Sequence, residues 1–179
     1  LGTHGRRAFK KLLLGSIAEE VFRTASCPVL TVGPQTAPVT AKSGLRHILY
    51  PMEFAPDTSK AAQYAVSLAE RYTATLTVMN VRENMAAADS TAEEFPQPFK
   101  RWLNDNVPDG SDLHNRIRFE RGFGPAADSL LSFVEKANVD LIVLSIRDLD
   151  PVMAAHVPTS NTTHQVVRRA PCPVLTIRR

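Results

Sequence analysis

Two stretches of this 179-residue chain repeat each other. Shifting the sequence by 145 positions aligns residues 16–32, SIAEEVFRTASCPVLTV, with residues 161–177, NTTHQVVRRAPCPVLTI, without a gap. Eight of these seventeen aligned positions are identical, whereas average residue usage gives about one identity by chance. A period of this size is the length of one domain, so the chain is predicted to hold two copies of one terminal unit.

The repeat predicts the domain organisation. We expect residues 1–34 to be the C-terminal fragment of a first domain, residues 35–44 to be a polar linker, and residues 45–179 to be a complete second domain. The first copy has no elements upstream of Leu1, so we expect the rest of its domain to be missing from this chain. A fragment this short cannot bury a core alone, so it is expected to pack on the second domain, to pack on another chain, or to be disordered.

Composition excludes several classes of protein. The chain is 44% hydrophobic and 22% charged, which is typical of a globular protein, and no run of about eighteen apolar residues predicts a membrane span. The net charge of +3 is spread over scattered Lys and Arg, which indicates a solvated surface rather than a nucleic-acid interface. Cys27 and Cys172 stand far apart without a C-x-x-C motif, which argues against a zinc site or a disulfide framework and favours the cytoplasm.

Residues 45–179 show strand and helix periodicities in alternation. Strands are expected at about 46–51, 75–81, 115–121, 140–146 and 173–178, with helices at about 57–72, 97–107, 126–138 and 161–169. This alternation predicts an α/β fold, a doubly wound five-stranded parallel sheet, in which ligands bind at the carboxyl ends of the strands.

The first sixteen residues, LGTHGRRAFKKLLLGS, form a glycine-rich stretch that runs into a helical pattern. Glycines at Gly2, Gly5 and Gly15 allow successive N–H groups to turn toward one point, and the next helix adds its free N–H groups. Ser16 and Glu19 form a capping box at the start of that helix. The pattern favours a phosphate-binding loop, and a flexible surface loop is the alternative.

The spacing Gly-x2-Gly-x9-Gly-Ser, followed by a short helix and by Cys27-Pro-Val-Leu-Thr-Val32, resembles the C-terminal half of a universal stress protein domain, and later segments match the same family. The resemblance implies the adenine nucleotide alpha hydrolase-like fold, a role in the stress response and ATP as the ligand of this loop. The contacts it implies are Gly2, Thr3, His4, Gly5, Gly15 and Ser16. It also implies antiparallel pairing through the last strands, so we expect a dimer that self-associates through Val29–Val32 or Val174–Ile177.

The second domain has lost the glycine loop. The same shift places Arg147, Asp150 and Ser160 where the first copy has Gly2, Gly5 and Gly15. The easy backbone turn is therefore lost, and Asp148 and Asp150 add negative charge where phosphates would lie. We expect no ATP in the second domain.

Two positions of the second domain correspond to nucleoside contacts that the family resemblance implies. The family's proline-x-aspartate turn after the first strand reads Pro51-Met52-Glu53 here, and Val81 ends the second strand. Glu53 and Val81 are therefore candidates for a vestigial nucleoside pocket. The competing interpretation is a solvated acid and a core valine.

The leading functional hypothesis is a nucleotide-responsive binding or regulatory module, with ATP held by the first domain and the second domain used for pairing. An ATP hydrolase or nucleotidyl transferase on the same fold is the alternative, and it would need a positioned base. His4 is the only loop candidate for that base, so the sequence favours a binder over an enzyme and assigns no catalytic and no metal residue. A ligand-free dimerisation module is the third possibility. No nucleic acid or membrane partner is expected.

Overall fold

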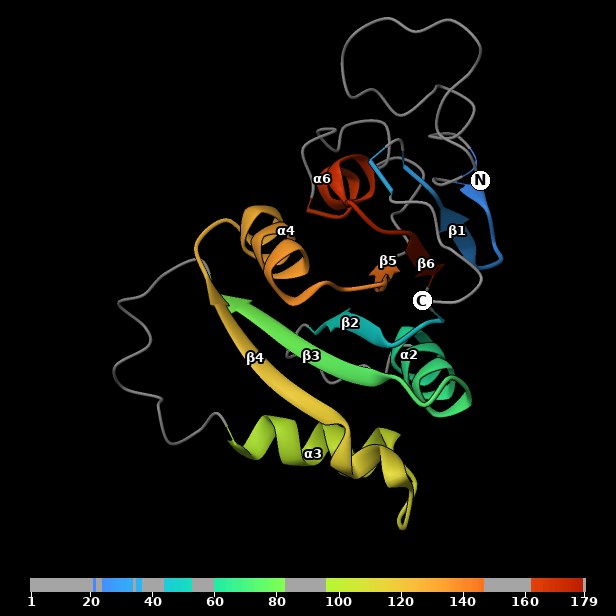
Figure 1. The fold of residues 1–179 in the computed structure, drawn as a ribbon, viewed down its shortest axis with the longest axis vertical. Helices are drawn as coiled ribbons and strands as arrows, with labels where there is room; N and C mark the ends of the chain where they lie inside the picture. The colour runs from blue at the N-terminus through green and yellow to red at the C-terminus, as the bar shows by residue number, and fades with distance from the viewer. Residues whose placement is uncertain are drawn as a thin grey trace, which may run out of the picture.

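The structure is a computed structural model that describes residues 21, 24–33, 35–36, 44–52, 60–82, 96–146 and 162–178. These residues form one six-stranded sheet with helices on both faces (Figure 1). The strands are β1 (Val29–Thr31), β2 (His47–Pro51), β3 (Thr75–Arg82), β4 (Ile117–Phe123), β5 (Leu141–Ile146) and β6 (Val174–Arg178). The helices are α2 (Lys60–Arg71), α3 (Pro96–Asn106), α4 (Ala126–Ala137) and α6 (Thr162–Arg169), with a short 3-10 turn, η2, at Asp112–Asn115.

The strand order is β1-β6-β5-β2-β3-β4. Every neighbouring pair from β6 to β4 is parallel, and β1 alone runs antiparallel, against β6. The predicted α/β fold and all five strands expected in residues 45–179 are confirmed, with ends that differ by at most two residues. The sheet has six strands rather than five because the first copy adds β1 to its edge.

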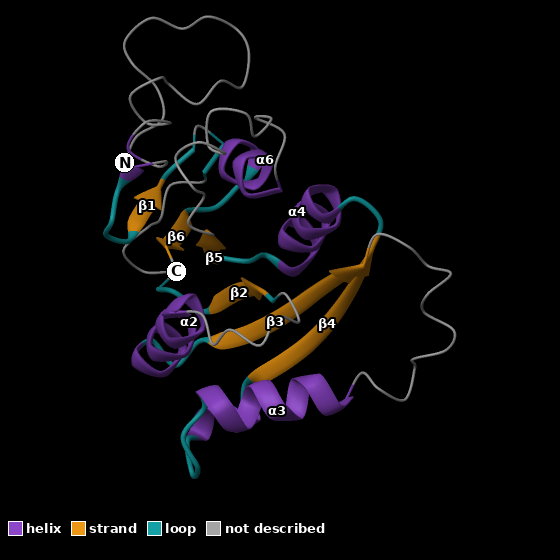
Figure 2. Cartoon of the chain, turned by 180° about the vertical axis from the view of Figure 1, so that it is seen from behind, coloured by secondary structure: helices purple, strands orange, loops and turns teal. Residues whose placement is uncertain are grey.

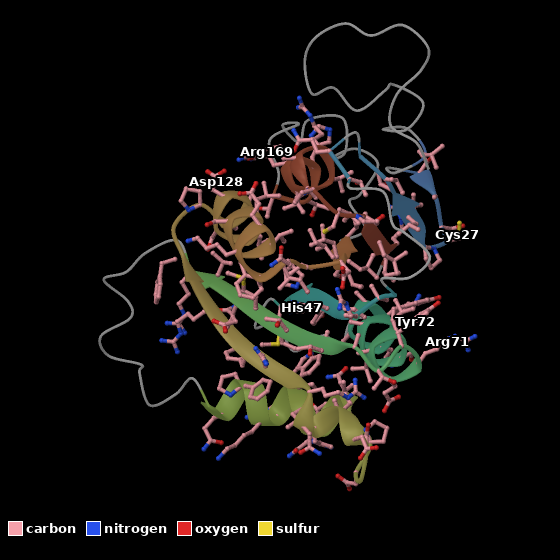
Figure 3. The ribbon with its side chains drawn as sticks, in the orientation of Figure 1. Cys27, His47, Arg71, Tyr72, Asp128 and Arg169 are labelled. Carbon is pink, nitrogen blue, oxygen red and sulfur yellow. The ribbon has the colours of Figure 1, made fainter. Side chains whose placement is uncertain are left out.

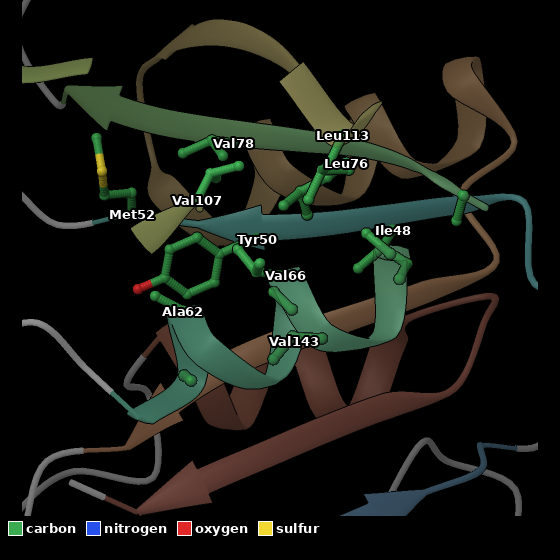
Figure 4. Packing of buried hydrophobic residues seen from close by; sticks show 14 of the residues in the cluster. Ile48, Tyr50, Met52, Ala62, Val66, Leu76, Val78, Val107, Leu113 and Val143 are labelled. Carbon is green, nitrogen blue, oxygen red and sulfur yellow. The ribbon is translucent and has the colours of Figure 1, made fainter. Parts of the chain in front are cut away.

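Side chains alternate between the two faces of the sheet, which gives two cores. On the face covered by α2 and α3, here called the α2 face, Ile48, Leu76 and Val78 are fully buried, and Figure 4 shows part of this cluster. The opposite face, here called the α4 face, is covered by α4 and α6 (Figure 2). Leu49 and Ile142 are fully buried in the core cluster on this face. The central strands β2, β3 and β5 are buried on both faces over most of their length, so they read as nearly continuous apolar runs, whereas the edge strand β4 exposes Arg118 and Glu120.

The two copies of the repeat have the same local structure. A helix end is followed by a bend and a strand at residues 24–31, and the same succession recurs at residues 169–176. Ala25 N–H donates to the Val21 carbonyl at 2.9 Å, and Ala170 N–H donates to the Val166 carbonyl at the same distance. Because both helices end with an equivalent hydrogen bond, the sequence repeat is also a structural repeat.

The two repeated strands pair with each other. Their register joins Val29 to Thr176, Leu30 to Leu175 and Thr31 to Val174. Adding the 145-residue shift to β1 gives the residues of β6, so exchanging the copies leaves the register unchanged. A local pseudo-two-fold axis therefore passes between Leu30 and Leu175. The expected antiparallel pairing of these strands is confirmed within the chain, and self-association between chains stays a prediction.

The division into a first-domain fragment, a linker and a second domain stays a prediction, because most of residues 35–44 lie outside the described ranges. Within those ranges, no helix combines the length and apolar character needed to cross a bilayer.

Candidate functional site

The sheet has a topological switch point between β2 and β5. From β2 the chain proceeds outward through β3 and β4, and it then returns to build β5 and β6 on the other side. In open parallel sheets the loops diverge at such a point and leave a crevice outside the carboxyl ends of the strands. Pro51 and Ile146 end the two strands that flank this point, so the candidate site lies at that edge.

Most of the predicted site residues fall on segments that the structure does not describe. This holds for Gly2, Thr3, His4, Gly5, Gly15 and Ser16 of the glycine loop and for Glu53 of the second domain. The equivalent positions of the second domain, from Arg147 to Ser160, are outside the described residues as well. Their roles stay predictions. The described part of the edge consists of the strand ends themselves.

Val81, the remaining predicted residue, is described and lies near the end of β3. It is half-buried and packs against the core beneath α4. Its partner in register on β4 is Gly122, where an added Cβ would lie 3.1 Å from Val81 Cγ2 and 2.6 Å from Met79 Cε. The close approach of these strands requires a residue without a side chain at Gly122. Val81 is thus part of the packing, and a nucleoside contact by its exposed part stays a prediction.

Asn80 connects β3 to the start of the loop that follows β2. Its Nδ2 donates to the Met52 carbonyl at 2.9 Å, and Met52 N–H donates to the Met79 carbonyl at 2.8 Å. Asn80 is buried, and its Oδ1 has no hydrogen-bond partner among the described residues. A buried acceptor left unpaired costs about 1–3 kcal/mol, so this oxygen favours any donor that reaches it.

Sequence reasoning did not single out Asn80. The available signal was a lone amide in the otherwise mostly apolar run TLTVMNV. Buried polar groups in native proteins almost always have a partner, so an amide in a buried strand indicates a specific contact. Asn80 Oδ1 is enclosed by the fold, whereas Val81 is partly exposed. These strand ends therefore offer a ligand an apolar contact at Val81.

The N-terminus of α4 also lies at this end of the sheet, but its charge is already balanced. Asp128 stands in the first turn of the helix, where a carboxylate offsets the partial positive charge of the free N–H groups. Arg169 of α6 places its Nη1 2.7 Å from Asp128 Oδ1, and Figure 3 labels both side chains. Within the described ranges no group of three or more His, Cys, Asp or Glu side chains could hold a metal ion.

The two cysteines occupy equivalent repeat positions in different environments. Cys27 is an exposed free thiol, whereas Cys172 is a buried one. Burial, together with a smaller effect of the negative charge of Asp140, raises the pKa of the Cys172 thiol from its ordinary 9.0 to about 12. Since the thiolate is the nucleophilic form, Cys172 is not a reactive group.

Comparison with known proteins agrees with this architecture. The model of the Universal stress protein family matches residues 1–33 and 44–178, which is most of the chain. A search of curated proteins gave no significant match.

Three solved structures illustrate the similarity of fold. A universal stress protein from Archaeoglobus fulgidus DSM 4304 superposes with a TM-score of 0.68 and 22% identity, over 100% of this chain and 59% of that one. A universal stress protein in complex with cAMP gives a TM-score of 0.54 and 14% identity, over 76% of this chain and 98% of that one. Universal stress protein UspA from Lactobacillus plantarum gives a TM-score of 0.51 and 24% identity, over 76% of this chain and 99% of that one. The chain spans about three fifths of the length of the A. fulgidus protein, and identities this low show the fold alone.

Proposed function

This chain belongs to the universal stress protein family, and from that premise we propose that it is a nucleotide-responsive binding module that holds ATP through the glycine loop of its first copy. In this proposal the second domain, residues 45–179, has lost ATP binding and serves for pairing. Because the chain covers only part of the length of the larger family structures, the proposal concerns the intact protein in which these residues occur.

One observation carries the proposal. The two copies end in the same helix-bend-strand structure and pair with each other through β1 and β6, yet only the segment before the first copy has glycines at all three loop positions. Both copies therefore share one local structure, whereas the glycine-rich sequence occurs before the first copy alone. This difference supports separate roles for the two copies. In this proposal one copy binds the nucleotide, and the other serves as its pairing partner.

The choice of a nucleotide as ligand has two supports. A family member of the same fold was solved in complex with cAMP, which is an adenine nucleotide. In this chain, the exposed part of Val81 offers a nucleobase an apolar contact at the carboxyl edge, on the α4 face of the sheet. Val81 supplies no positive charge, so phosphate binding is assigned to the glycine loop.

The loop residues would each contribute a stated contact. Gly2, Gly5 and Gly15 would present backbone N–H groups to the phosphates, and Ser16 would direct the N-terminus of the following helix toward them. Thr3 and His4 would add side-chain donors. When bound, ATP supplies the negative charge toward which these donors point.

Isothermal titration of the full chain with ATP tests the assignment. Substituting Gly15→Val adds a branched side chain to the loop, and the matched control Ser160→Val makes the same change at the equivalent position of the second copy. We expect Gly15→Val to weaken ATP binding at least about tenfold, because a β-branched residue resists the backbone turn that aims the N–H groups at the charged phosphates, and Ser160→Val to leave it unchanged. The reverse pattern, or an ATP affinity equal in both variants, would overturn the assignment.

A second measurement separates a binder from a hydrolase. Incubation of the chain with magnesium and ATP should release no phosphate above the background. Phosphate release that His4→Ala abolishes would instead support the enzymatic alternative.

The free thiols support residence in the cytoplasm. Neither cysteine is part of a disulfide, and Cys27 is exposed. An exposed free thiol is typical of a reducing compartment.

A further inference from the structure

A pocket of about 420 Å³ lies on the α4 face, at the amino ends of the strands and therefore at the edge opposite the candidate nucleotide site. The side chains that define it come from three strands and one helix: His47 of β2, Thr75 and Thr77 of β3, Arg118 and Glu120 of β4, and Phe133 of α4. Figure 3 labels His47. None of these residues belongs to the site proposed for ATP.

The pocket lies where the residues on the α4 face change from apolar to polar along the strands. Toward the carboxyl ends, Leu49 and Met79 are buried beneath α4. Toward the amino ends, the same face carries His47, Thr75 and Thr77, where the last turn of α4 leaves the sheet partly open. A polar row in a buried sheet needs partners, so the hydrogen bonds of these residues show what the pocket can offer.

The floor of the pocket is held by a hydrogen-bonded histidine. His47 Nδ1 lies 3.1 Å from the Ala137 carbonyl, which can only accept, so Nδ1 carries a proton. In the neutral ring Nε2 then accepts from Thr77 Oγ1 at 2.8 Å. The Phe133 ring stands at 84° to the imidazole with centroids 6.3 Å apart. One aromatic wall and one polar floor are therefore fixed before any ligand arrives.

The two charged groups of the pocket are opposite in sign and close together. Arg118 and Glu120 are two residues apart on one face of β4, which places their Cα atoms about 6.6 Å apart. Both are exposed, and neither makes an ion pair or a side-chain hydrogen bond with another described residue. A simple anion would be attracted by Arg118 and repelled by Glu120, and a simple cation would meet the reverse. A zwitterion is attracted by both.

We propose that this pocket binds a free α-amino acid with an apolar side chain. The Arg118 guanidinium takes the carboxylate, Glu120 takes the ammonium group, and the side chain lies against Phe133. The Thr75 hydroxyl supplies a further hydrogen bond. This makes the chain responsive to a second small molecule, at the other end of the sheet from the nucleotide.

Calorimetric titration of the full chain with L-phenylalanine and with L-leucine tests the proposal. We expect saturable binding of at least one of them with a Kd of about 1 mM or tighter, which is realistic for so few ligand atoms. Two analogues separate the charges: hydrocinnamate lacks the ammonium group, and phenethylamine lacks the carboxylate. Each should bind at least about tenfold more weakly than L-phenylalanine.

Variants locate the binding. Arg118→Gln and Glu120→Gln should each weaken it about tenfold, whereas Arg101→Gln, an equally exposed change on α3, should leave it unchanged. The exchange of both charges, Arg118→Glu with Glu120→Arg, should retain more binding than either single variant. Absence of saturable binding by both amino acids would overturn the proposal. Binding of hydrocinnamate as tight as that of L-phenylalanine, or binding unaffected by Arg118→Gln, would do the same.

Discussion

Thr176 Oγ1 donates a hydrogen bond to the Val29 carbonyl at 3.2 Å, so the two copies of the repeat are joined by a side chain as well as by their strand pairing. The pseudo-two-fold relation between β1 and β6 makes Thr31 the counterpart of Thr176. Thr31 is equally buried, but its hydroxyl has no hydrogen-bond partner among the described residues. Two equivalent threonines therefore differ in whether their polar atom is paired.

This asymmetry gives a matched pair of substitutions. Thr176→Val removes a buried hydrogen bond at constant shape and should lower the free energy of unfolding by about 1 kcal/mol. Thr31→Val removes an unpaired buried hydroxyl and should be neutral or stabilising, by up to about 1 kcal/mol. Urea unfolding followed by circular dichroism measures both. Equal destabilisation by the two variants would show that the copies are not distinguished in this way.

Asp140 precedes β5 and holds the start of β2. Its Oδ2 accepts from the backbone N–H groups of Arg46 and His47, each at 2.9 Å. Asp140→Ala should lower the free energy of unfolding by about 2 kcal/mol, because two partly buried donors lose a charged acceptor. Asp140→Asn keeps an acceptor oxygen and should cost less.

The control for the half-buried Asp140 is Asp128, a more exposed acid whose partner is a surface arginine. Asp128 pairs with Arg169, and both side chains are about half exposed, at 57% and 44%. Asp128→Ala should cost less than about 1 kcal/mol, as exposed ion pairs do. A larger loss for Asp128→Ala than for Asp140→Ala in the same urea titrations would contradict this ranking.

Gly122 allows β4 to lie close to β3 and α4. A methyl group there would overlap Ser129 Oγ and lie 2.6 Å from Met79 Cε, so Gly122→Ala should lower the free energy of unfolding by about 1–3 kcal/mol. The double variant with Ser129→Ala removes the closest obstacle and should recover part of the loss. Gly33→Ala is the control, because its nearest neighbour would be 3.6 Å away. Thermal unfolding of the three variants decides whether the close approach is required.

Cys172 predicts a pH dependence. Burial raises its thiol pKa from 9.0 to about 12, so the unfolded chain loses this proton at a lower pH than the folded chain. The resulting contribution to stability is fully present below pH 9 and is lost as the pH rises toward 12. The unfolding free energy of Cys172→Ala should therefore decrease less between pH 9 and pH 12 than that of the parent protein. The substitution also removes packing, which lowers the stability equally at all pH values and is subtracted.

Thiol labelling at pH 8 checks the same environment. An aromatic disulfide reagent should modify Cys27 rapidly and Cys172 only when the chain unfolds. Cys27→Ser should remove the fast phase. Two fast equivalents in the native protein would contradict the burial of Cys172.

Much of the fold followed from local patterns. The apolar run of β5 and the helical stripe of α4 lie where their periodicities predicted them, because buried strands and amphipathic helices must match the pleat and the turn of their own backbone. The family resemblance implied that β1 would lie beside β6, and the pairing is observed. The spacing of the glycines favours an anion-binding loop over a flexible surface loop, and this stays a prediction.

The pocket at the amino ends of the strands could not be predicted from local sequence patterns. His47 and Phe133 are separated by 86 positions in the chain and meet only because β2 lies beneath α4. The unpaired oxygen of Asn80 and the difference between Thr31 and Thr176 are equally invisible in a linear pattern. A short-range period reports which face of an element is apolar. It carries no information about which distant side chain arrives opposite a given atom.

Amino-acid order was thus sufficient to establish the α/β class and the repeated unit, since each depends on local periodicity or on similarity between two stretches. The pairing of the two copies was implied by the resemblance to a known family. The packing of the sheet and its helices decided three further features. It set the register that relates Leu30 to Leu175, and it buried Cys172 while leaving Cys27 exposed. It also brought Arg118, Glu120 and His47 to one pocket. The reason is that burial and proximity are properties of the assembled layers, in which residues far apart along the chain share one environment.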